Sequence, residues 1–302
     1  IGLDHILRNS GKMRFGKLGN AVVRLIKSRD LLDLMLAEGQ HNPAFCLCDN
    51  PACADCVSQR AVLRQALLKK EDFRLTLSSS LAGRYVPEII DSLTAAGCGY
   101  VELDYLQGRP AVKMPRNTLS AAVAEFAAAG IEVSALRLPM VPLELSNELA
   151  EVRNTGIKRL IVPLAANAPE LAGQAEAAGL KIDFVNCGLS GAYTDRLLST
   201  LPLPSLVFNP AEFARAGEKP FLETFRYGKL RRHILQLDLE DGCFDGTPAH
   251  LARGNGELKE LISILRCGSF GGFMSVTAGN RRGSTKNATE FVIELLRLLQ
   301  EI

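Results

Sequence analysis

The stretch FRLTLSSSLAGRYVPEIIDSLTAAGCGYVELDYL, residues 73–106, contains one complete strand–helix–strand unit. Residues 73–81 form a short, strand-like apolar run. Residues 86–97 follow with apolar positions spaced i, i+3, i+4 and a terminal glycine, a pattern that predicts an amphipathic helix ending at Gly97. A second strand-like run occupies 99–106. The unit therefore predicts a crossover connection between two parallel strands.

This unit repeats to the end of the chain. Six further strand-like runs follow, at 131–138, 157–165, 181–189, 204–210, 233–241 and 271–279. Residues 118–130 predict a helix with Thr118 as its N-cap, and 285–302 predict the last helix. Eight strand–helix units within residues 73–302 match the number and length of a (β/α)8 barrel, or TIM barrel. An open, doubly wound sheet is the alternative, although no G-x-G-x-x-G motif follows the first strand.

Residues 1–72 do not follow the repeat and are expected to form a separate N-terminal appendage. The apolar spacing of 18–39 predicts one or two amphipathic helices, and 58–70 predict a helix that leads into the first barrel strand. We expect this segment to pack on the barrel, because it is too short and too polar to carry much core alone. The predicted domains are therefore 1–72 and 73–302.

The appendage contains the segment FCLCDNPACADC, residues 45–56, with the spacing C-x-C-x4-C-x2-C. Its four thiols are those of Cys46, Cys48, Cys53 and Cys56. Thiolates this close repel one another and oxidise readily, and a soft metal resolves both problems by binding them. Tetrahedral zinc and a [4Fe–4S] cluster both use four thiolates, and the spacing does not separate them. Disulfides or free thiols are the third interpretation, and the centre is expected to act as a structural staple.

The bulk composition excludes several classes of protein. The 302 residues are 47% apolar and 23% charged with a net charge of +2, which indicates neither nucleic-acid binding nor an acidic partner. No run of 18 apolar residues predicts a membrane span, and residues 1–17 lack the apolar core of a signal peptide. The uneven spread of the eight cysteines differs from a secreted disulfide framework. We expect a cytoplasmic protein, and the sequence is compatible with a homo-oligomer without deciding the oligomeric state.

The last third of the chain resembles the xylose-isomerase-like superfamily of TIM barrels, which includes sugar phosphate isomerases and epimerases and relatives of endonuclease IV. Residues 236–279 match that family's seventh strand, G-x-G loop, helix and eighth strand, with RGNGELKELISIL at 253–265 as the most similar part. Residues 208–225 are similar to the sixth strand and its helix. The resemblance covers 73–302 and implies a (β/α)8 barrel with a divalent metal at its mouth.

The ligands that the resemblance implies are largely replaced in this chain. The family uses Glu, Asp, His and Glu on strands five to eight, and the corresponding residues here are Asn186, Asn209, Asp238 and Thr277. Gln236 stands two residues before Asp238, where the family has another histidine. A hard divalent ion needs anionic oxygen or imidazole ligands, and only one carboxylate remains. We therefore expect a degenerate metal site with no divalent metal at the barrel mouth.

Several polar side chains are expected at the mouth, where ligands bind in TIM barrels. Strand alternation places Glu102, Gln236 and Asp238 on inner faces, and Glu102 and Asp238 are the expected proton-transfer residues. The expected substrate-binding residues are Arg137, Asn186, Asn209, Gln236, Glu240, Thr277, Arg281 and Arg282. Arg281 and Arg282 lie in a glycine-flanked loop before the last helix, which is a frequent place for an anion grip in this fold.

These observations predict a sugar isomerase/epimerase-like barrel, or a lyase, with altered chemistry on a small polar substrate that carries an anionic group. Two alternatives stay open: a non-catalytic barrel that binds a small molecule or a partner, and an iron–sulfur redox protein. DNA repair of the endonuclease IV kind is disfavoured, because it relies on several histidine ligands and the chain has four histidines in all.

Overall fold

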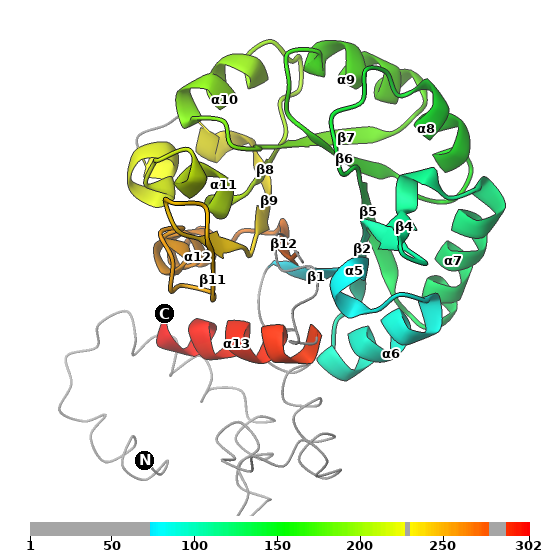
Figure 1. Cartoon of the computed structure of the whole chain (residues 1–302), viewed down its shortest axis with the longest axis horizontal. Coiled ribbons are helices and arrows are strands. Elements are labelled where there is room, and N and C mark those ends of the chain that lie inside the picture. Colours follow the sequence, from blue (N-terminus) through cyan, green and yellow to red (C-terminus); the bar gives the residue numbers. More distant parts are fainter. Residues whose placement is uncertain (1–72, 227–229, 278–287) are drawn as a thin grey trace, which may run out of the picture.

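The computed structural model describes residues 73–226, 230–277 and 288–302. Eight parallel strands close into a barrel in the order β1-β12-β9-β8-β7-β6-β5-β2 (Figure 1). These strands are β1 Arg74–Ser78, β2 Tyr100–Leu103, β5 Glu132–Arg137, β6 Arg159–Pro163, β7 Lys181–Val185, β8 Leu206–Phe208, β9 Ile234–Asp238 and β12 Phe273–Val276. Each lies within a run that the sequence predicted. The TIM barrel is therefore confirmed, and the open sheet is excluded.

Helices surround the barrel in the ring that Figure 1 shows. They are α5 Ser79–Ala82, α6 Val86–Ala96, α7 Arg116–Ala128, α8 Ser146–Val152, α9 Ala168–Ala177, α10 Gly191–Leu198, α11 Pro210–Arg215, α12 Leu258–Cys267 and α13 Ala288–Glu301. Helix α6 ends as predicted, because Gly97 takes the left-handed conformation at φ 70°. The predicted start of α7 is wrong: the helix begins at Arg116, two residues before Thr118. Pro115 precedes it with φ −57°, a value that its ring favours and that leads into a helix.

Short elements fill the connections. Two antiparallel ribbons pair β3 Tyr105–Leu106 with β4 Arg109–Pro110, and β10 Asp241–Gly242 with β11 Pro248–Ala249. A 3-10 turn spans Ala111–Lys113, a π-helical segment spans Pro220–Arg226, and a second 3-10 turn spans Leu230–His233. The N-terminal helices predicted at 18–39 and 58–70 lie outside the described residues.

Two separate apolar clusters hold the barrel together. The larger lies between strands and helices, and alternation supplies it with Leu75 and Leu77 of β1 and Met274 and Val276 of β12. The smaller lies inside the barrel and consists of Ala135, Ile161, Val185 and Val207. These four residues come from β5, β6, β7 and β8. The inner faces of the other four strands carry mostly polar side chains, so the polar half of the interior is where a site can form.

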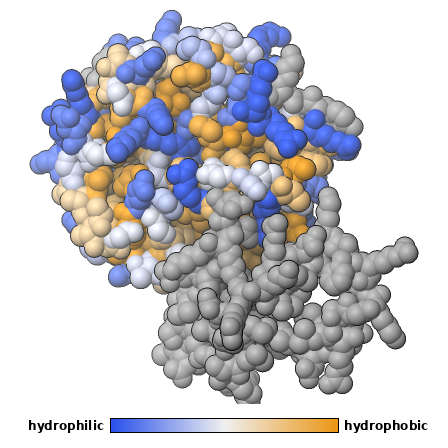
Figure 2. Space-filling view, turned by 180° about the vertical axis from the view of Figure 1, so that it is seen from behind, coloured by the Kyte–Doolittle hydropathy of each residue, from blue (hydrophilic) through white to orange (hydrophobic). Residues whose placement is uncertain are grey.

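The described surface is mixed in polarity. Figure 2 shows hydrophilic residues interrupting the apolar areas of the face seen from behind. Among the helices of the described ranges, none is long and apolar enough to cross a membrane. The last helix, α13, packs beside α6, and near its C-terminal end Glu301 pairs with Lys259 of α12.

Candidate functional site

The candidate site lies at the mouth of the barrel, where the carboxyl ends of the strands meet. Glu102 comes from the inner face of β2, Arg137 is the last residue of β5, and Asp238 is the last residue of β9. Gln236 precedes Asp238 on the same face of β9. Glu102, Gln236 and Asp238 are all 0% exposed, so these three side chains are fully buried.

One guanidinium joins the two carboxylates. Arg137 donates from Nε to Glu102 Oε1 at 2.5 Å and from Nη2 to Asp238 Oδ1 at 2.9 Å. Gln236 Nε2 also donates to both groups, at 2.8 Å to Glu102 Oε2 and 2.9 Å to Asp238 Oδ1. The side chain of Arg137 is 16% exposed and is the outermost of the four. The carboxylates are therefore linked to each other through two shared donors and lie beneath a cation.

The two carboxylates differ in pKa, although they share the same hydrogen-bond donors. Burial raises the pKa of Asp238 to about 6, with Arg137 opposing the rise and the Glu102 carboxylate adding to it. Burial also acts to raise the pKa of Glu102, but the charge and hydrogen bond of Arg137 outweigh it, so that pKa lies below its usual value. Near neutral pH, Glu102 is the ionised member, and Asp238 is the group that can take up or release a proton.

A second polar cluster lies beside the first. Asn209, which follows β8, donates from Nδ2 to Glu240 Oε2 at 3.0 Å, and Thr277 Oγ1 donates to the same oxygen at 3.2 Å. Asn209 Nδ2 is also 3.5 Å from Asp238 Oδ2, which connects the two clusters. The structure thus brings together Asn209, Glu240 and Thr277, as well as the first group of Glu102, Arg137, Gln236 and Asp238.

Asn186, which was expected to bind substrate, forms two hydrogen bonds to the main chain of Asn209. Its Oδ1 accepts from the backbone N–H of Asn209 at 2.8 Å, and its Nδ2 donates to the carbonyl oxygen of Asn209 at 2.9 Å. Both ends of the amide therefore bind main chain between β7 and β8. This geometry fits a residue that fixes the position of Asn209.

Sequence reasoning missed two side chains that contact the first cluster. Ser275 Oγ donates to Glu102 Oε2 at 3.1 Å, and it could have been found from its alternation with Thr277 on β12. Arg159 Nη1 donates to Gln236 Oε1 at 2.9 Å from the first residue of β6. A charged residue at the start of a strand is typical of a solvated position, so the sequence gives no signal that this long side chain reaches the interior.

The structure explains the two glycines of the G-x-G loop, which resembles that of the xylose-isomerase-like superfamily. The carboxylate of Asp241 accepts from the backbone N–H groups of Gly254 and Gly256, at 2.9 Å and 2.8 Å. A Cβ atom at Gly254 or Gly256 would lie 2.5 Å or 2.7 Å from Asp241 Oδ1, so both positions of the G-x-G motif require glycine. The motif therefore allows this loop to bind Asp241, which lies shortly after the end of β9.

Several predicted site residues lie outside the described part of the chain. They are Arg281, Arg282, Cys46, Cys48, Cys53 and Cys56. Within the ranges that the structure describes, no group of three or more His, Cys, Asp or Glu side chains is arranged to hold a metal ion.

Comparison with solved structures identifies the fold. A xylose isomerase domain protein from Planctomyces limnophilus aligns with a TM-score of 0.58 at 12% identity, over 77% of this chain and 97% of its own. A probable 3-DHS dehydratase from Bacillus anthracis aligns at 0.57 and 11% identity, over 74% of this chain and 99% of its own. These alignments show that the chain shares its barrel fold with these proteins.

A D-tagatose 3-epimerase-like protein aligns with a TM-score of 0.54 at 15% identity, over 76% of this chain and 97% of its own. The structural neighbours thus include sugar isomerase/epimerase-like barrels, as the sequence resemblance predicted. No protein-family profile matches the sequence, and no curated protein matches it. At these identities the likeness shows the fold, and the function has to be argued from the site.

Proposed function

We propose that the barrel is an isomerase/epimerase-type enzyme with altered chemistry, in which Asp238 transfers a proton at a carbon next to a carbonyl group of a small polar substrate. The observation that carries the proposal is the guanidinium of Arg137 between Glu102 and Asp238. Asp238 has a pKa of about 6, raised chiefly by burial, which suits a group that gains and loses a proton near neutral pH.

The proposed proton transfer uses the residues in distinct roles. The ionised carboxylate of Asp238 takes the proton from the substrate carbon, and the electrons of that C–H bond form the C=C bond of an enediolate. The negative charge then lies on the former carbonyl oxygen, next to the exposed edge of Arg137, which stabilises it. The hydroxyl proton on the carbon that lost its hydrogen then moves to this charged oxygen, and return of the carbon-bound proton to the neighbouring carbon leaves a new carbonyl group and completes an isomerisation. Glu102 keeps Arg137 charged and positioned, because the two carboxylates outweigh the effect of burial and raise the pKa of the guanidinium.

We propose that this chemistry proceeds without a divalent metal at the mouth, because the residues present do not fit one. Both amide atoms of Asn186 are committed to the backbone of Asn209. Asp238 Oδ1 already accepts from Arg137 and Gln236, and a guanidinium 2.9 Å away would repel a divalent cation. The donor set of two amides, one hydroxyl and one carboxylate therefore supports a cationic role for Arg137 in place of a metal.

The charge of the mouth limits the choice of substrate. The described side chains here include the carboxyl groups of Glu102, Asp238 and Glu240 but one guanidinium, that of Arg137. An anionic group on the substrate would therefore need Arg281 and Arg282, the residues proposed as an anion grip in the loop before α13. Their neutralisation to Gln is expected to weaken binding of a phosphorylated substrate more than of its neutral form.

The proposal is tested by proton exchange, which can be detected before the product is identified. The full chain is incubated in D2O with aldoses, ketoses, their phosphates and keto acids of three to six carbons, and exchange is followed by 1H NMR. At least one compound should exchange a carbon-bound proton, and Asp238→Asn should slow that exchange by about 100-fold or more. Glu301→Gln, an exposed carboxylate on α13, is the matched control and should leave the rate unchanged.

A non-catalytic barrel that binds a small molecule is the second candidate. It is favoured by the fully buried carboxylates of Glu102 and Asp238, which are already paired and covered by Arg137. Saturable binding of a compound from the same panel, without proton exchange and with loss of binding in Arg137→Gln, would replace the enzymatic proposal with this one.

We further propose that Cys46, Cys48, Cys53 and Cys56 hold zinc or a [4Fe–4S] cluster as a structural centre, an inference that rests on their spacing alone. Metal analysis of anaerobically purified protein together with a visible absorbance scan tests it. One equivalent of zinc in a colourless protein supports zinc, and four equivalents of iron with a broad visible band support the cluster. Absence of both metals would reject the centre and, with it, the alternative of an iron–sulfur redox protein.

A further inference from the structure

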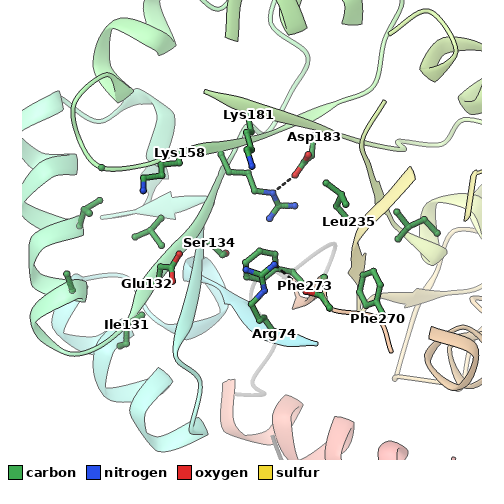
Figure 3. Close-up of a pocket in the computed structure, with 18 residues that line it drawn as sticks. Arg74, Ile131, Glu132, Ser134, Lys158, Lys181, Asp183, Leu235, Phe270 and Phe273 are labelled. Carbon is green, nitrogen blue, oxygen red and sulfur yellow. Dashed lines mark hydrogen bonds and ion pairs between the residues drawn. The ribbon is translucent and has the colours of Figure 1, made fainter. Parts of the chain in front are cut away.

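A cavity of about 720 Å³ lies at the end of the barrel opposite the mouth. Its lining includes the first residue of six barrel strands, namely Arg74, Glu132, Arg159, Lys181, Ile234 and Phe273. Figure 3 shows Arg74, Lys181, Asp183 and Phe273 pointing into the ring of strands, and Lys158 directed away from its centre. The volume lies within the range of small-molecule sites in proteins. The cavity is therefore a second hollow, distinct from the mouth where the proposed chemistry takes place.

Positive side chains predominate in this cavity. Four cationic residues line it, namely Arg74, Lys158, Arg159 and Lys181, against two carboxylates, those of Glu132 and Asp183. Asp183 is already neutralised, because Arg159 Nε pairs with its Oδ2 and Ser205 donates to its Oδ1. The lining then has three further cationic residues, Arg74, Lys158 and Lys181, and one further carboxylate, that of Glu132.

Two guanidinium groups also converge on one aromatic ring. The Cζ atoms of Arg74 and Arg159 lie 4.0 Å and 5.1 Å from the ring centroid of Phe273. Arg159 Nη2 is buried and has no hydrogen-bond partner among the described residues. A buried donor without an acceptor is unfavourable, and two like charges on one ring repel each other. An anion between the two guanidinium groups would accept a hydrogen bond from Arg159 and would offset the repulsion between the two charges.

The cations have a second explanation, which accounts for only part of the pattern. Helices α7 and α9 end at this side of the barrel, and positive side chains are favourable near the carbonyl groups of helix C-termini. That effect accounts for exposed lysines at the rim. It does not account for the hollow between them, for the buried nitrogen of Arg159, or for the apolar floor that Phe270 and the 52% exposed Leu235 provide.

We propose that this cavity is a binding site for a small phosphate-bearing molecule. Its phosphate would lie among Arg74, Arg159 and Lys181, where guanidinium groups offer paired donors and an ammonium group adds charge, and Lys158 would add positive charge at the rim. Its less polar part would contact Phe270 and Leu235. The site is separate from the barrel mouth, so the proposal stands or falls independently of the proton-transfer chemistry.

The test is titration calorimetry of the full chain with sodium pyrophosphate at low salt and neutral pH. Saturable binding is expected, and the double variant Lys158→Gln/Lys181→Gln should weaken it at least fivefold. Both lysines are exposed, so their replacement should leave the melting temperature unchanged. The matched control is Lys219→Gln/Lys259→Gln, which removes the same charge from exposed positions outside the cavity and should change the affinity less than twofold.

Three outcomes would overturn the proposal. The first is the absence of saturable binding. The second is an equal loss of affinity in the two double variants, which would indicate general attraction to the surface. The third is equal binding of citrate and pyrophosphate at the cavity, which would show selection for negative charge and not for phosphate.

Discussion

At the mouth of the barrel, the guanidinium of Arg137 lies between two buried carboxylates, whereas at the opposite end Arg159 pairs with one. The mouth therefore has an excess of acidic groups, and the opposite cavity has an excess of basic groups. Gln236 connects the two, since its Oε1 accepts from Arg159 and its Nε2 donates to Glu102 and Asp238. The same type of ion-pair cluster thus surrounds a carboxyl group with a raised pKa at one end and lies beside an excess of cations at the other.

Removal of Arg137 should have the largest effect, because it leaves two buried carboxylates without their cation. We expect Arg137→Met to lower the free energy of unfolding by about 3–5 kcal/mol at pH 8, measured by urea denaturation. Lys259→Met is the control, since the pair of Lys259 with Glu301 lies at the surface and its loss should cost less than about 1 kcal/mol. Equal losses in the two variants would contradict a buried cluster at the mouth.

Removal of Arg159 should have a smaller effect than removal of Arg137. Arg159→Met leaves one buried carboxylate, that of Asp183, and this group keeps the hydroxyl of Ser205 as a donor. We expect a loss of about 3 kcal/mol in the same denaturation experiment. A loss larger than that of Arg137→Met would reverse the comparison and make the cavity end the more tightly coupled of the two.

The pH dependence of stability should report Asp238. Its pKa in the folded protein is about 6, raised above the usual value chiefly by burial, so the folded state holds a proton that the unfolded state releases between about pH 4 and 6. Stability relative to Asp238→Asn should therefore fall by about 2 kcal/mol as the pH rises from 4.5 to 7, and should change little above that. Glu102, whose pKa is lowered, contributes with the opposite sign. A difference that is flat or rises with pH would refute the assignment.

A matched pair of serines sharpens the comparison at a smaller scale. Ser275 donates to Glu102 at the mouth, and Ser205 donates to Asp183 at the opposite end. Glu102 keeps Arg137 and Gln236 as donors when Ser275 is lost, whereas Asp183 keeps Arg159. We expect Ser205→Ala to cost about 2 kcal/mol and Ser275→Ala about 1 kcal/mol in urea unfolding. A larger loss in Ser275→Ala than in Ser205→Ala would show that the number of remaining hydrogen-bond donors does not decide the loss of stability.

The strands and the inner face of the site could be predicted from the sequence, because both depend on short-range periodicity. Alternation placed Glu102, Gln236 and Asp238 inside the barrel, and a glycine stop ended α6 at Ala96. The start of α7 was misplaced, because Thr118 is a good N-cap but the preceding Pro115 already sets the helix entry.

The contacts of the long side chains could not be predicted. Arg137 reaches Glu102 and Asp238 across 35 and 101 residues of sequence, and no local pattern encodes a meeting of three strands. Arg159 reaches Gln236 across 77 residues from a strand end that resembles a solvated position. Asn186 corresponds in sequence to a metal ligand of the family, and only the structure shows that its amide binds the backbone of Asn209.

The central claim is that the guanidinium of Arg137 provides the cation between Glu102 and Asp238, and the most direct test is Mn2+ titration followed by electron paramagnetic resonance. Mn2+ prefers oxygen ligands and so avoids the thiolates of the N-terminal segment. The wild-type protein and Asp238→Asn should bind Mn2+ equally weakly, with no saturable site that depends on Asp238. A saturable Mn2+ site in the wild-type protein that disappears in Asp238→Asn would contradict it.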